Sequence, residues 1–244
     1  INDRGWVLKY ILNTHSHADH IGGNKYLQDN TGCRIYANGI ENAFINYPIL
    51  EPTFLFGAYP PDDLRHKFLL APESHTENLC SDNLSDIIEI IPLPGHCLDM
   101  VGFRISNEVV YLADSLSSKE VIDKYRIVFL YDVQTHLDTL EGLKQAEGKI
   151  FIPSHAEVTD DINALVQYNI DSVYCVADRI YNICKKPRCF DNILQCLFNE
   201  FELNLNFSQY ALVGSTLKSY LSWMKSKGRI KTVIEDNLLL WQSV

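Results

Sequence analysis

The feature that most constrains this chain is a cluster of four metal-binding side chains within six residues, His15-Ser-His17-Ala-Asp19-His20. Where thiolate clusters are absent, imidazole and carboxylate groups are the preferred protein ligands of first-row divalent metals such as zinc. The apolar run Val7–Leu12 just before the cluster predicts a buried strand, so the cluster begins in the loop where that strand ends. A single tetrahedral ion cannot readily use four groups from so short a loop, whereas two adjacent metals can.

Three more candidate ligands stand at the ends of other predicted strands. His96 follows one apolar run through a Pro-Leu-Pro-Gly turn, Asp114 ends a second run, and His155 follows a third through Pro-Ser. If these strand ends share one rim of a sheet, the three side chains join the histidine cluster. A short carboxylate such as Asp114 can bridge two cations roughly 3.5–4 Å apart, as two-metal hydrolases require.

These segments resemble the four ordered motifs of the metallo-β-lactamase superfamily, and within it those of the glyoxalase II-like hydrolases. The matching motifs are Thr14-His-Ser-His-Ala-Asp-His-Ile-Gly-Gly23, Pro94-Gly95-His96, Ala113-Asp114-Ser115 and Pro153-Ser154-His155. The resemblance implies two metal ions, zinc in the first place with iron and manganese as alternatives. It implies that the first metal is held by His15, His17, His96 and Asp114. It implies that the second is held by Asp19, His20, His155 and the bridging Asp114.

The same resemblance makes these seven residues the catalytic set of a dinuclear zinc-dependent hydrolase. Two cations sharing a water lower its pKa from near 15.7 to roughly 7, so a metal-bridging hydroxide is the expected nucleophile. Asp19 is expected to orient this nucleophile in addition to binding the second metal. A small ester or thioester is the expected substrate, because the glyoxalase II-like relatives act on acyl compounds of that kind.

Other activities stay open within the superfamily. A phosphodiesterase or ribonuclease is one alternative, because members with a C-terminal winged-helix-like domain include RNA-cleaving enzymes. A mononuclear-iron sulfur dioxygenase is another, and it uses only the ligands equivalent to His15, His96 and Asp114. The second ligand set gives the dioxygenase no positive support. A non-enzymatic metal sensor is the remaining alternative, and a protein that turns over no ester, thioester, lactam or phosphodiester would favour it.

Two features depart from the superfamily pattern. Its αββα sandwich places several strands before the first motif, yet only 14 residues precede His15, so the sandwich is expected to lack its N-terminal strands. The chain also begins at Ile1 rather than Met, which suggests that it is incomplete at this end. Cys97 stands where many relatives have Thr, and its thiol is expected to be either a spectator or a redox liability.

Residues 1–183 alternate strand and helix patterns, which predicts an α/β catalytic domain. The expected strands are 7–12, 33–37, 87–91, 101–105, 109–113 and 150–152, and the expected helices include 130–146 and a long one from about 160 to 177. Residues 47–72 contain five prolines and predict a long ordered loop or lid. Its aromatic residues Phe54, Phe56 and Tyr59 are candidates for the substrate pocket, although loop aromatics more often anchor a loop to the core.

The segment Cys184–Cys189 interrupts the helical pattern with a proline and several charges, so it predicts a linker to a second domain, residues 190–244. That domain is expected to contain three short helices and a β-hairpin, a winged-helix-like pattern. Its third helix, starting at Ser215 or Thr216 and stopping at Gly228, begins a basic strip on an exposed face. The strip either contacts phosphates or is simply solvated, and we favour solvation. Its residues are Lys218, Ser222, Lys225, Lys227, Arg229 and Lys231.

The charge balance argues for a small-molecule substrate. The net charge is −10, and the nine Lys/Arg against seven Asp/Glu from Asp171 onward leave −12 on the first 170 residues. Such a surface disfavours nucleic acid as a partner without excluding it. The remaining histidines, His66, His75 and His136, are expected at the surface or in local hydrogen bonds. Nothing in the sequence predicts an oligomeric state.

Cellular location follows from two further patterns. No apolar run reaches the length of a membrane span and no secretion signal is visible, so a membrane partner is not expected. The seven cysteines are an odd number without close pairing, unlike the framework of a disulfide-stabilised secreted domain. A cytoplasmic protein is the expectation.

Overall fold

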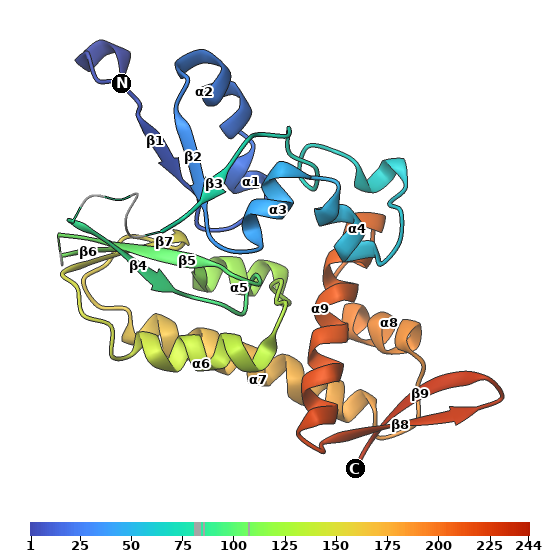
Figure 1. Ribbon diagram of the computed structural model, residues 1–244. Coiled ribbons are helices and arrows are strands. Elements are labelled where there is room, and N and C mark those ends of the chain that lie inside the picture. Colours follow the sequence, from blue (N-terminus) through green and yellow to red (C-terminus); the bar gives the residue numbers. More distant parts are fainter. Residues whose placement is uncertain (81–83, 85, 107) are drawn as a thin grey trace.

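Two β-sheets form the centre of the molecule in the computed structural model, which describes residues 1–80, 84, 86–106 and 108–244 (Figure 1). A short 3-10 helix, η1 (Asn2–Arg4), precedes the parallel sheet β1-β2-β3. Its strands are Tyr10–Leu12, Arg34–Ala37 and Glu77–Asn78. The second sheet has the order β4-β5-β6-β7, antiparallel except for the parallel β6–β7 pair. Its strands are Ile88–Pro92, Val101–Ile105, Val109–Ser117 and Ile150–His155, close to the predicted positions.

Helices cover the outer face of each sheet. α2 (Asn24–Thr31) and α3 (Glu41–Asn46) contact β2, whereas α6 (Val133–Leu143) and α7 (Asn163–Ile183) contact β6 (Figure 1). Between the sheets, buried side chains of β2, β5 and their neighbours form one cluster, Tyr36, Leu79, Val101 and Phe103. The layers therefore follow the order helix, sheet, sheet, helix, as expected for an αββα sandwich.

Strand β6 shows how the sequence pattern positions these layers. Val110 and Leu112 are fully buried in the core under α6 and α7, while Tyr111 between them is 41% exposed, as the two-residue period of a strand requires. At the far end of β6, Asn169 of α7 accepts a hydrogen bond from the Ser117 backbone N–H at 3.0 Å and donates one to its carbonyl at 2.9 Å. The helix thereby fixes the strand end from which Asp114 extends.

The segment 47–72 is not the long loop that its prolines predicted. Residues Leu50–Phe56 form helix α4, and Asp62–Leu64 form a 3-10 helix, η2. Pro52 is tolerated because it lies in the first turn of α4, where a backbone N–H has no partner within the helix. Leu55 and Leu64 are buried together with Ala211 of the C-terminal part, so the segment is packed rather than open.

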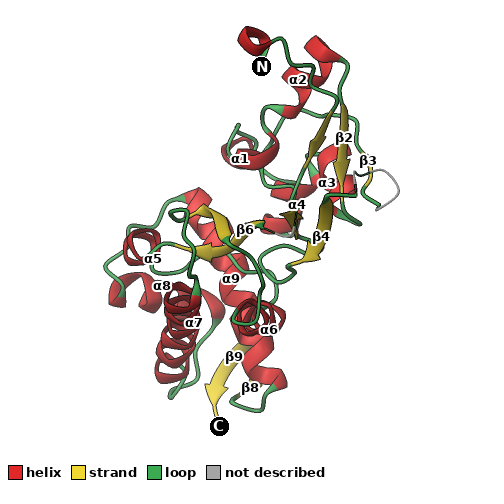
Figure 2. Cartoon of the chain, turned by 90° about the vertical axis from the view of Figure 1, so that its left-hand side faces the viewer, coloured by secondary structure: helices red, strands yellow, loops and turns green. Residues whose placement is uncertain are grey.

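The C-terminal part contains α8 (Phe190–Glu200), α9 (Phe207–Ser226) and a hairpin of β8 (Ile230–Glu235) and β9 (Leu238–Ser243). The predicted hairpin is confirmed, but the third helix, expected to start at Ser215 or Thr216, is the second half of the single helix α9, which begins at Phe207. The described residues after 190 thus hold two helices rather than three. The hairpin lies at the opposite end of the molecule from the first sheet (Figures 1 and 2).

One buried cluster runs through the second sheet and the C-terminal helices. It joins Val110 of β6 to Val173 of α7, Leu194 of α8 and Leu217 of α9. The sheet and the C-terminal helices therefore share a hydrophobic core, while the division into domains 1–183 and 190–244 and the winged-helix-like class stay predictions. Over the described ranges, no helix is both long enough and apolar enough to cross a membrane.

Candidate metal centre

The seven predicted ligands lie together at one edge of the sandwich. The Asp114 carboxylate is at the middle, with the Nε2 atoms of four histidines within 3.8 Å of one or other of its oxygens. These distances are 3.0 Å to His155, 3.1 Å to His20, 3.6 Å to His96 and 3.8 Å to His15. The Asp19 carboxylate lies 3.7 Å from His20 Nε2 and 3.8 Å from His155 Nε2, and His17 Nδ1 lies 3.1 Å from His96 Nε2.

Strand ends bring most of these groups together, but Asp114 lies inside β6, which continues past the predicted end to Ser117. The histidine cluster follows β1 and leads into α1 (Ala18–Ile21), His96 lies in the turn after β4, and His155 is the last residue of β7. In β6 the pairing with β7 shifts register on both sides of Ala113, whose φ is +49°. Such an irregularity re-aims the following side chain. Asp114 consequently turns toward the histidines.

Several buried polar atoms at this centre have no hydrogen-bond partner among the described residues. They are His15 Nε2, His20 Nε2 and Asp114 Oδ1. His20 Nε2 and Asp114 Oδ1 lie 3.1 Å apart, but their geometry does not make a hydrogen bond. A buried polar atom left unpaired costs about 1–3 kcal/mol. The Nδ1–H of His96 donates to the Phe129 carbonyl at 3.0 Å, so its Nε2 atom is an acceptor and faces His17 Nδ1 at 3.1 Å. Unpaired imidazole and carboxylate atoms converging on one point fit divalent cations.

The protonation states also suit metal binding. Burial lowers the pKa of His15, His17 and His96, so these imidazoles are neutral at physiological pH. Burial alone would raise the pKa of Asp114, but the close His155 and His20 imidazoles hold it well below the usual range. Metal ligands must be neutral imidazoles and ionised carboxylates. His15, His17, His96 and Asp114 meet this requirement. Against the effect of burial, the adjacent Asp114 carboxylate raises the pKa of His20, and it raises that of His155 as well, so a proton on either ring must leave when a metal binds.

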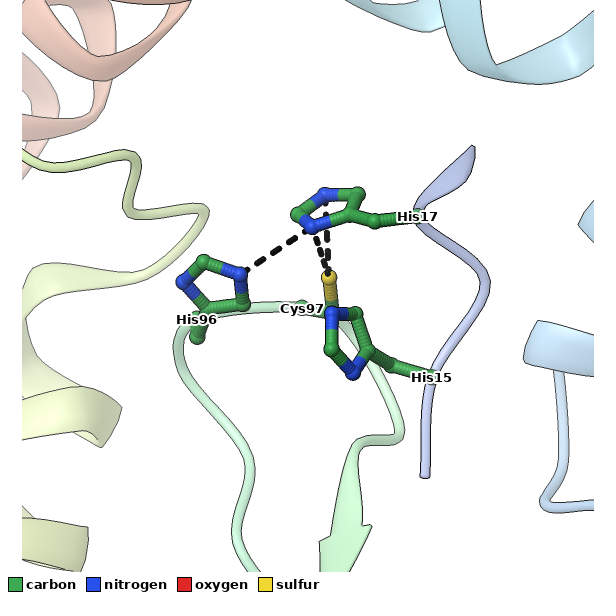
Figure 3. Close-up of side chains that lie close together, drawn as sticks. All are labelled: His15, His17, His96 and Cys97. Carbon is green, nitrogen blue, oxygen red and sulfur yellow. Dashed lines mark hydrogen bonds between the residues drawn. The ribbon is translucent and has the colours of Figure 1, made fainter. Parts of the chain in front are cut away.

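Figure 3 shows a buried thiol beside the first group of histidines: Cys97, on the loop of His96, points toward His17 of the other loop. Its Sγ lies 3.3 Å from His17 Nε2, and one ligand atom from each of His15, His17, His96 and Cys97 can be chosen so that all four lie within 4.8 Å of one another. Burial and the neighbouring carboxylates raise the pKa of this thiol well above its usual value. A buried protonated thiol is chemically inert, which favours the spectator role over a redox liability.

Two buried acids beside the centre were not singled out from the sequence. Glu41 of α3 accepts hydrogen bonds from the backbone N–H groups of Ser16, at 2.9 Å, and Asp99, at 3.1 Å, and so ties the two ligand loops together. The Oε1 atom of Glu51 in α4 lies 3.5 Å from His17 Nε2, and burial raises the pKa of this carboxyl to about 8. The sequence signal for each residue is its place on a helix, which the loop prediction for 47–72 obscured in the case of Glu51.

A cavity of about 550 Å³ opens beside the metal centre. Four of the predicted ligands contribute to its wall, namely Asp19, His96, Asp114 and His155. The rest of the wall comes from α5 (Lys119–Tyr125), the segment 127–130, α6 and α9. This cavity is the natural place for a substrate, because clefts with a few converging polar groups are the usual ligand sites of proteins.

Within the described chain, none of the three aromatic candidates lines this cavity. Phe56 packs against Phe207 of α9, with ring centroids 6.1 Å apart, and Tyr59 is 72% exposed under the guanidinium of Arg65. Phe54 borders a separate small space that His17 and Cys97 also line. A role of Phe54, Phe56 or Tyr59 in substrate binding stays a prediction.

The other histidines differ from one another in placement. His66 Nε2 lies 3.2 Å from the Ser208 hydroxyl and His75 is exposed, as expected for residues outside the centre. The same expectation was wrong for His136, which is 3% exposed, forms part of the cavity wall and leaves its Nδ1 atom without a partner among the described residues. Its burial depends on the packing of α6 against the His96 loop, which no local pattern reveals.

Gly95 is required by this packing. Its φ is +119°, and a Cβ atom there would overlap the backbone of His136. We expect Gly95→Ala to lower the free energy of unfolding by more than about 2 kcal/mol, because a non-glycine residue is strained at this φ and the loop must also move. Urea unfolding measures the change. Gly142→Ala in α6, where a Cβ meets nothing within 4 Å, is the control and should stabilise by about 0.5–1 kcal/mol. Equal stability of Gly95→Ala and the parent protein would contradict the prediction.

Comparison with known proteins agrees with this geometry. The family model described as the Metallo-beta-lactamase superfamily matches residues 1–155. The chain is 32% identical over 115 residues to the hydroxyacylglutathione hydrolase of Rhodopseudomonas palustris, which covers 47% of this chain and 36% of that protein. It is 32% identical over 119 residues to the hydroxyacylglutathione hydrolase of Pelagibacter ubique, which covers 48% of this chain and 40% of that protein. The matches therefore span well under half of the length of these curated relatives.

Solved structures resemble the chain over nearly its whole length. A beta-lactamase domain protein from Burkholderia ambifaria has a TM-score of 0.71 at 15% identity and covers 99% of this chain and 75% of that one. A metallo-beta-lactamase family protein from Thermus thermophilus has a TM-score of 0.73 at 14% identity, with 97% and 80% covered. At such low sequence identities the structural likeness shows only the fold. The match to the superfamily model covers more than half of the chain and shows the family. The chain belongs to the metallo-β-lactamase superfamily.

Proposed function

We propose that this protein is a dinuclear zinc-dependent hydrolase that acts on a small ester or thioester. The observation that carries the proposal is the ionised Asp114 carboxylate surrounded by the Nε2 atoms of four histidines, several of their atoms buried without partners. The hydroxyacylglutathione hydrolases among its relatives support the acyl class of substrate.

Two ligand sets support two cations. His15, His17 and His96 would hold the first, Asp19, His20 and His155 the second, and Asp114 would contact both. The sets His15-His20-Asp114 and Asp19-His20-His155 each offer ligand atoms lying within 4.8 Å of one another. When bound, two divalent cations supply Lewis acidity and a nucleophile at neutral pH.

The protein itself supplies orientation. Thr14 Oγ1 lies 3.0 Å from His15 Nδ1 and Phe129 accepts the His96 Nδ1–H, so both rings are held with Nε2 toward Asp114. Of the two proposed carboxylate ligands, Asp19 is the more exposed, with a side chain 57% exposed, and it borders the cavity. It can therefore accept a hydrogen bond from a water that attacks a substrate lying in that cavity.

The alternative activities have less support. A single-iron dioxygenase leaves the Asp19-His20-His155 set without a role. For a nuclease, the basic strip would have to be available to phosphates, but Lys225 Nζ donates to Thr232 Oγ1 at 2.9 Å and Arg229 pairs with Asp178 at 2.9 Å. All seven cysteines are free thiols, which is consistent with a reducing compartment such as the cytoplasm.

Metal content and turnover on purified protein test the proposal together. We expect two zinc ions per chain, hydrolysis of acyl thioesters, loss of that activity on chelation and its return with added zinc. One iron per chain with consumption of oxygen would establish the dioxygenase instead. Two bound metals with no turnover of any ester, thioester, lactam or phosphodiester would favour the sensor.

Glu51 offers a separate test of the first ligand set. A ligating imidazole commonly donates its other N–H to a carboxylate, and losing that partner weakens metal binding about 10- to 100-fold. We expect Glu51→Ala to lower zinc affinity by that amount, and Glu51→Gln, which keeps an acceptor oxygen, to lower it less. Competition against a chromophoric chelator measures the affinity. Cys97→Ser, which changes the other neighbour of His17 Nε2, is the matched variant. If it lowered zinc affinity as much as Glu51→Ala does, the thiol would have the role assigned to Glu51.

A further inference from the structure

We propose that the cavity beside the metal centre binds an uncharged, apolar group of the substrate several carbons long, rather than a short hydroxyacyl group or a polyanionic carrier. The inference rests on the proposed hydrolytic function and specifies its substrate class. The apolar group belongs either to the acyl side or to the leaving group of the ester, and the chemistry of the wall is the same for both.

The cavity is continuous with the reacting centre. Asp19, His96, Asp114 and His155 of that centre line it together with residues of α5 and α9. Its volume of about 550 Å³ lies within the range of about 300–1,000 Å³ typical of small-molecule sites. An ester bond held at the metal centre would therefore place one of its two substituents in this space.

Much of the wall is aliphatic and aromatic. This apolar part comes from Val121 of α5, the consecutive residues Ile127 to Leu130, and Leu212 and Val213 of α9. The uncharged polar side chains of the wall are Ser115, Ser117, Asn169, Gln209 and Thr216. Transfer of apolar surface from water to such a wall is favourable by about 0.8 kcal/mol for each methylene group. A substrate with a longer alkyl or an aryl substituent gains this energy, whereas a hydroxyacyl group of two or three carbons gains little.

The charges of the wall do not suit an anionic group. Apart from the proposed ligands and histidines, the charged side chains among the described wall residues are Glu120 and Lys124, one of each sign on α5. The Lys124 ammonium lies over the Tyr125 ring, 4.7 Å from its centroid. Recognition of several carboxylates or phosphates normally uses a group of arginines or lysines. A single lysine offset by a glutamate provides no such group.

One polar atom in this wall has no partner. His136 is 3% exposed and belongs to the cavity wall. Its Nδ1 atom makes no hydrogen bond to the described residues. Because this atom is itself buried, His136 contributes the surface of its ring to the wall rather than a hydrogen bond to the substrate.

Two substrate series on the zinc-loaded protein test the proposal and identify the occupant. One series lengthens the acyl chain of a thioester from acetyl to octanoyl with a constant thiol, and the other lengthens the thiol with a constant acetyl group. We expect kcat/KM to rise about fourfold for each methylene in one of the two series. An added terminal carboxylate should remove the gain. A flat response in both series, with efficient cleavage of hydroxyacyl thioesters, would overturn the proposal.

Binding without turnover separates this proposal from the proposed function. Octanoate is expected to bind the zinc-loaded protein at least 100-fold more tightly than acetate by calorimetry, on the order of fourfold for each methylene that enters the cavity. Octanoate binding without hydrolysis of any ester would retain the cavity assignment and refute the hydrolase. Ester hydrolysis together with equal affinities for octanoate and acetate would retain the hydrolase and refute the cavity assignment.

A cavity-filling variant provides the structural control. Val121→Trp puts a large ring into the wall from the half-buried face of α5, and should lower the octanoyl-to-acetyl ratio of kcat/KM more than tenfold. Ile234→Trp makes a comparable change at a residue of β8 that is 74% exposed and remote from the cavity wall, and should leave the ratio unaltered. An unchanged ratio in Val121→Trp would place the apolar group elsewhere.

Discussion

Asp114→Ala is expected to lower kcat/KM on the best thioester by more than about 100-fold and to leave fewer than two metals per chain. Loss of a residue that only hydrogen-bonds to a metal ligand already lowers metal affinity or activity about 10- to 100-fold. Asp114 is closer to the centre than that, because it is the carboxylate nearest to four of the histidines. Its loss would also remove the carboxylate that His20 and His155 approach at 3.1 and 3.0 Å. Steady-state kinetics and metal analysis on the same sample measure the two effects.

The control for this change is Asp160→Ala, which removes an exposed carboxylate outside the centre. It should retain both metals and the parental rate. Asp114→Asn, which keeps the size of the side chain but loses its charge, should fall between the two. If Asp114→Ala kept two metals and stayed within tenfold of the parental kcat/KM, Asp114 could not be the shared ligand.

Removing the metals is expected to destabilise the fold strongly. Ions that bind only the folded protein stabilise it by about 4.1 kcal/mol at a free concentration 1,000 times Kd. For a chain of this size that corresponds to a rise in Tm of about 8–16 °C between chelated and zinc-loaded protein. The buried, unpartnered atoms of His15, His20 and Asp114 explain why the metal-free fold is the weaker one. Thermal unfolding in excess chelator and in excess zinc measures the difference.

Magnesium provides the control for this experiment, because it prefers oxygen ligands and retains its waters. It should raise Tm far less than zinc does at the same concentration. A zinc effect that persists in a His15→Ala, His20→Ala double variant would show that the ions act elsewhere on the protein. Equal Tm values with chelator and with zinc would contradict the dinuclear proposal directly.

The grouping of the seven ligands followed from local sequence features. From the sequence, the strand ends are expected to share one rim, and the superfamily motifs supply the ligand set. Strands β4, β6 and β7 run in the same direction, so His96, Asp114 and His155 come close together. The hairpin was equally local, because Asp236 and Asn237 adopt the positive φ angles, +48° and +63°, that its turn requires.

What the sequence missed depends on packing between distant segments. Gly214 would ordinarily weaken a helix, but it is buried where a Cβ would come within 3.5 Å of the Phe190 ring, and α9 continues through it. Glu51 and His136 became part of the site because α4 and α6 pack beside the ligand loops. Neither burial leaves a trace in the neighbouring residues, so spacing and composition could not identify them.

The cavity wall is assembled from two parts of the chain, of which only the first is matched by the superfamily model. The superfamily match ends at residue 155, whereas Leu212 and Val213 of α9 face the cavity from well beyond it. Changes in α9 can therefore alter the choice of substrate during evolution while the ligand loops stay constant. A relative that shares the metal motifs but differs in this helix is a guide to the reaction chemistry, and a poor guide to the molecule that reacts.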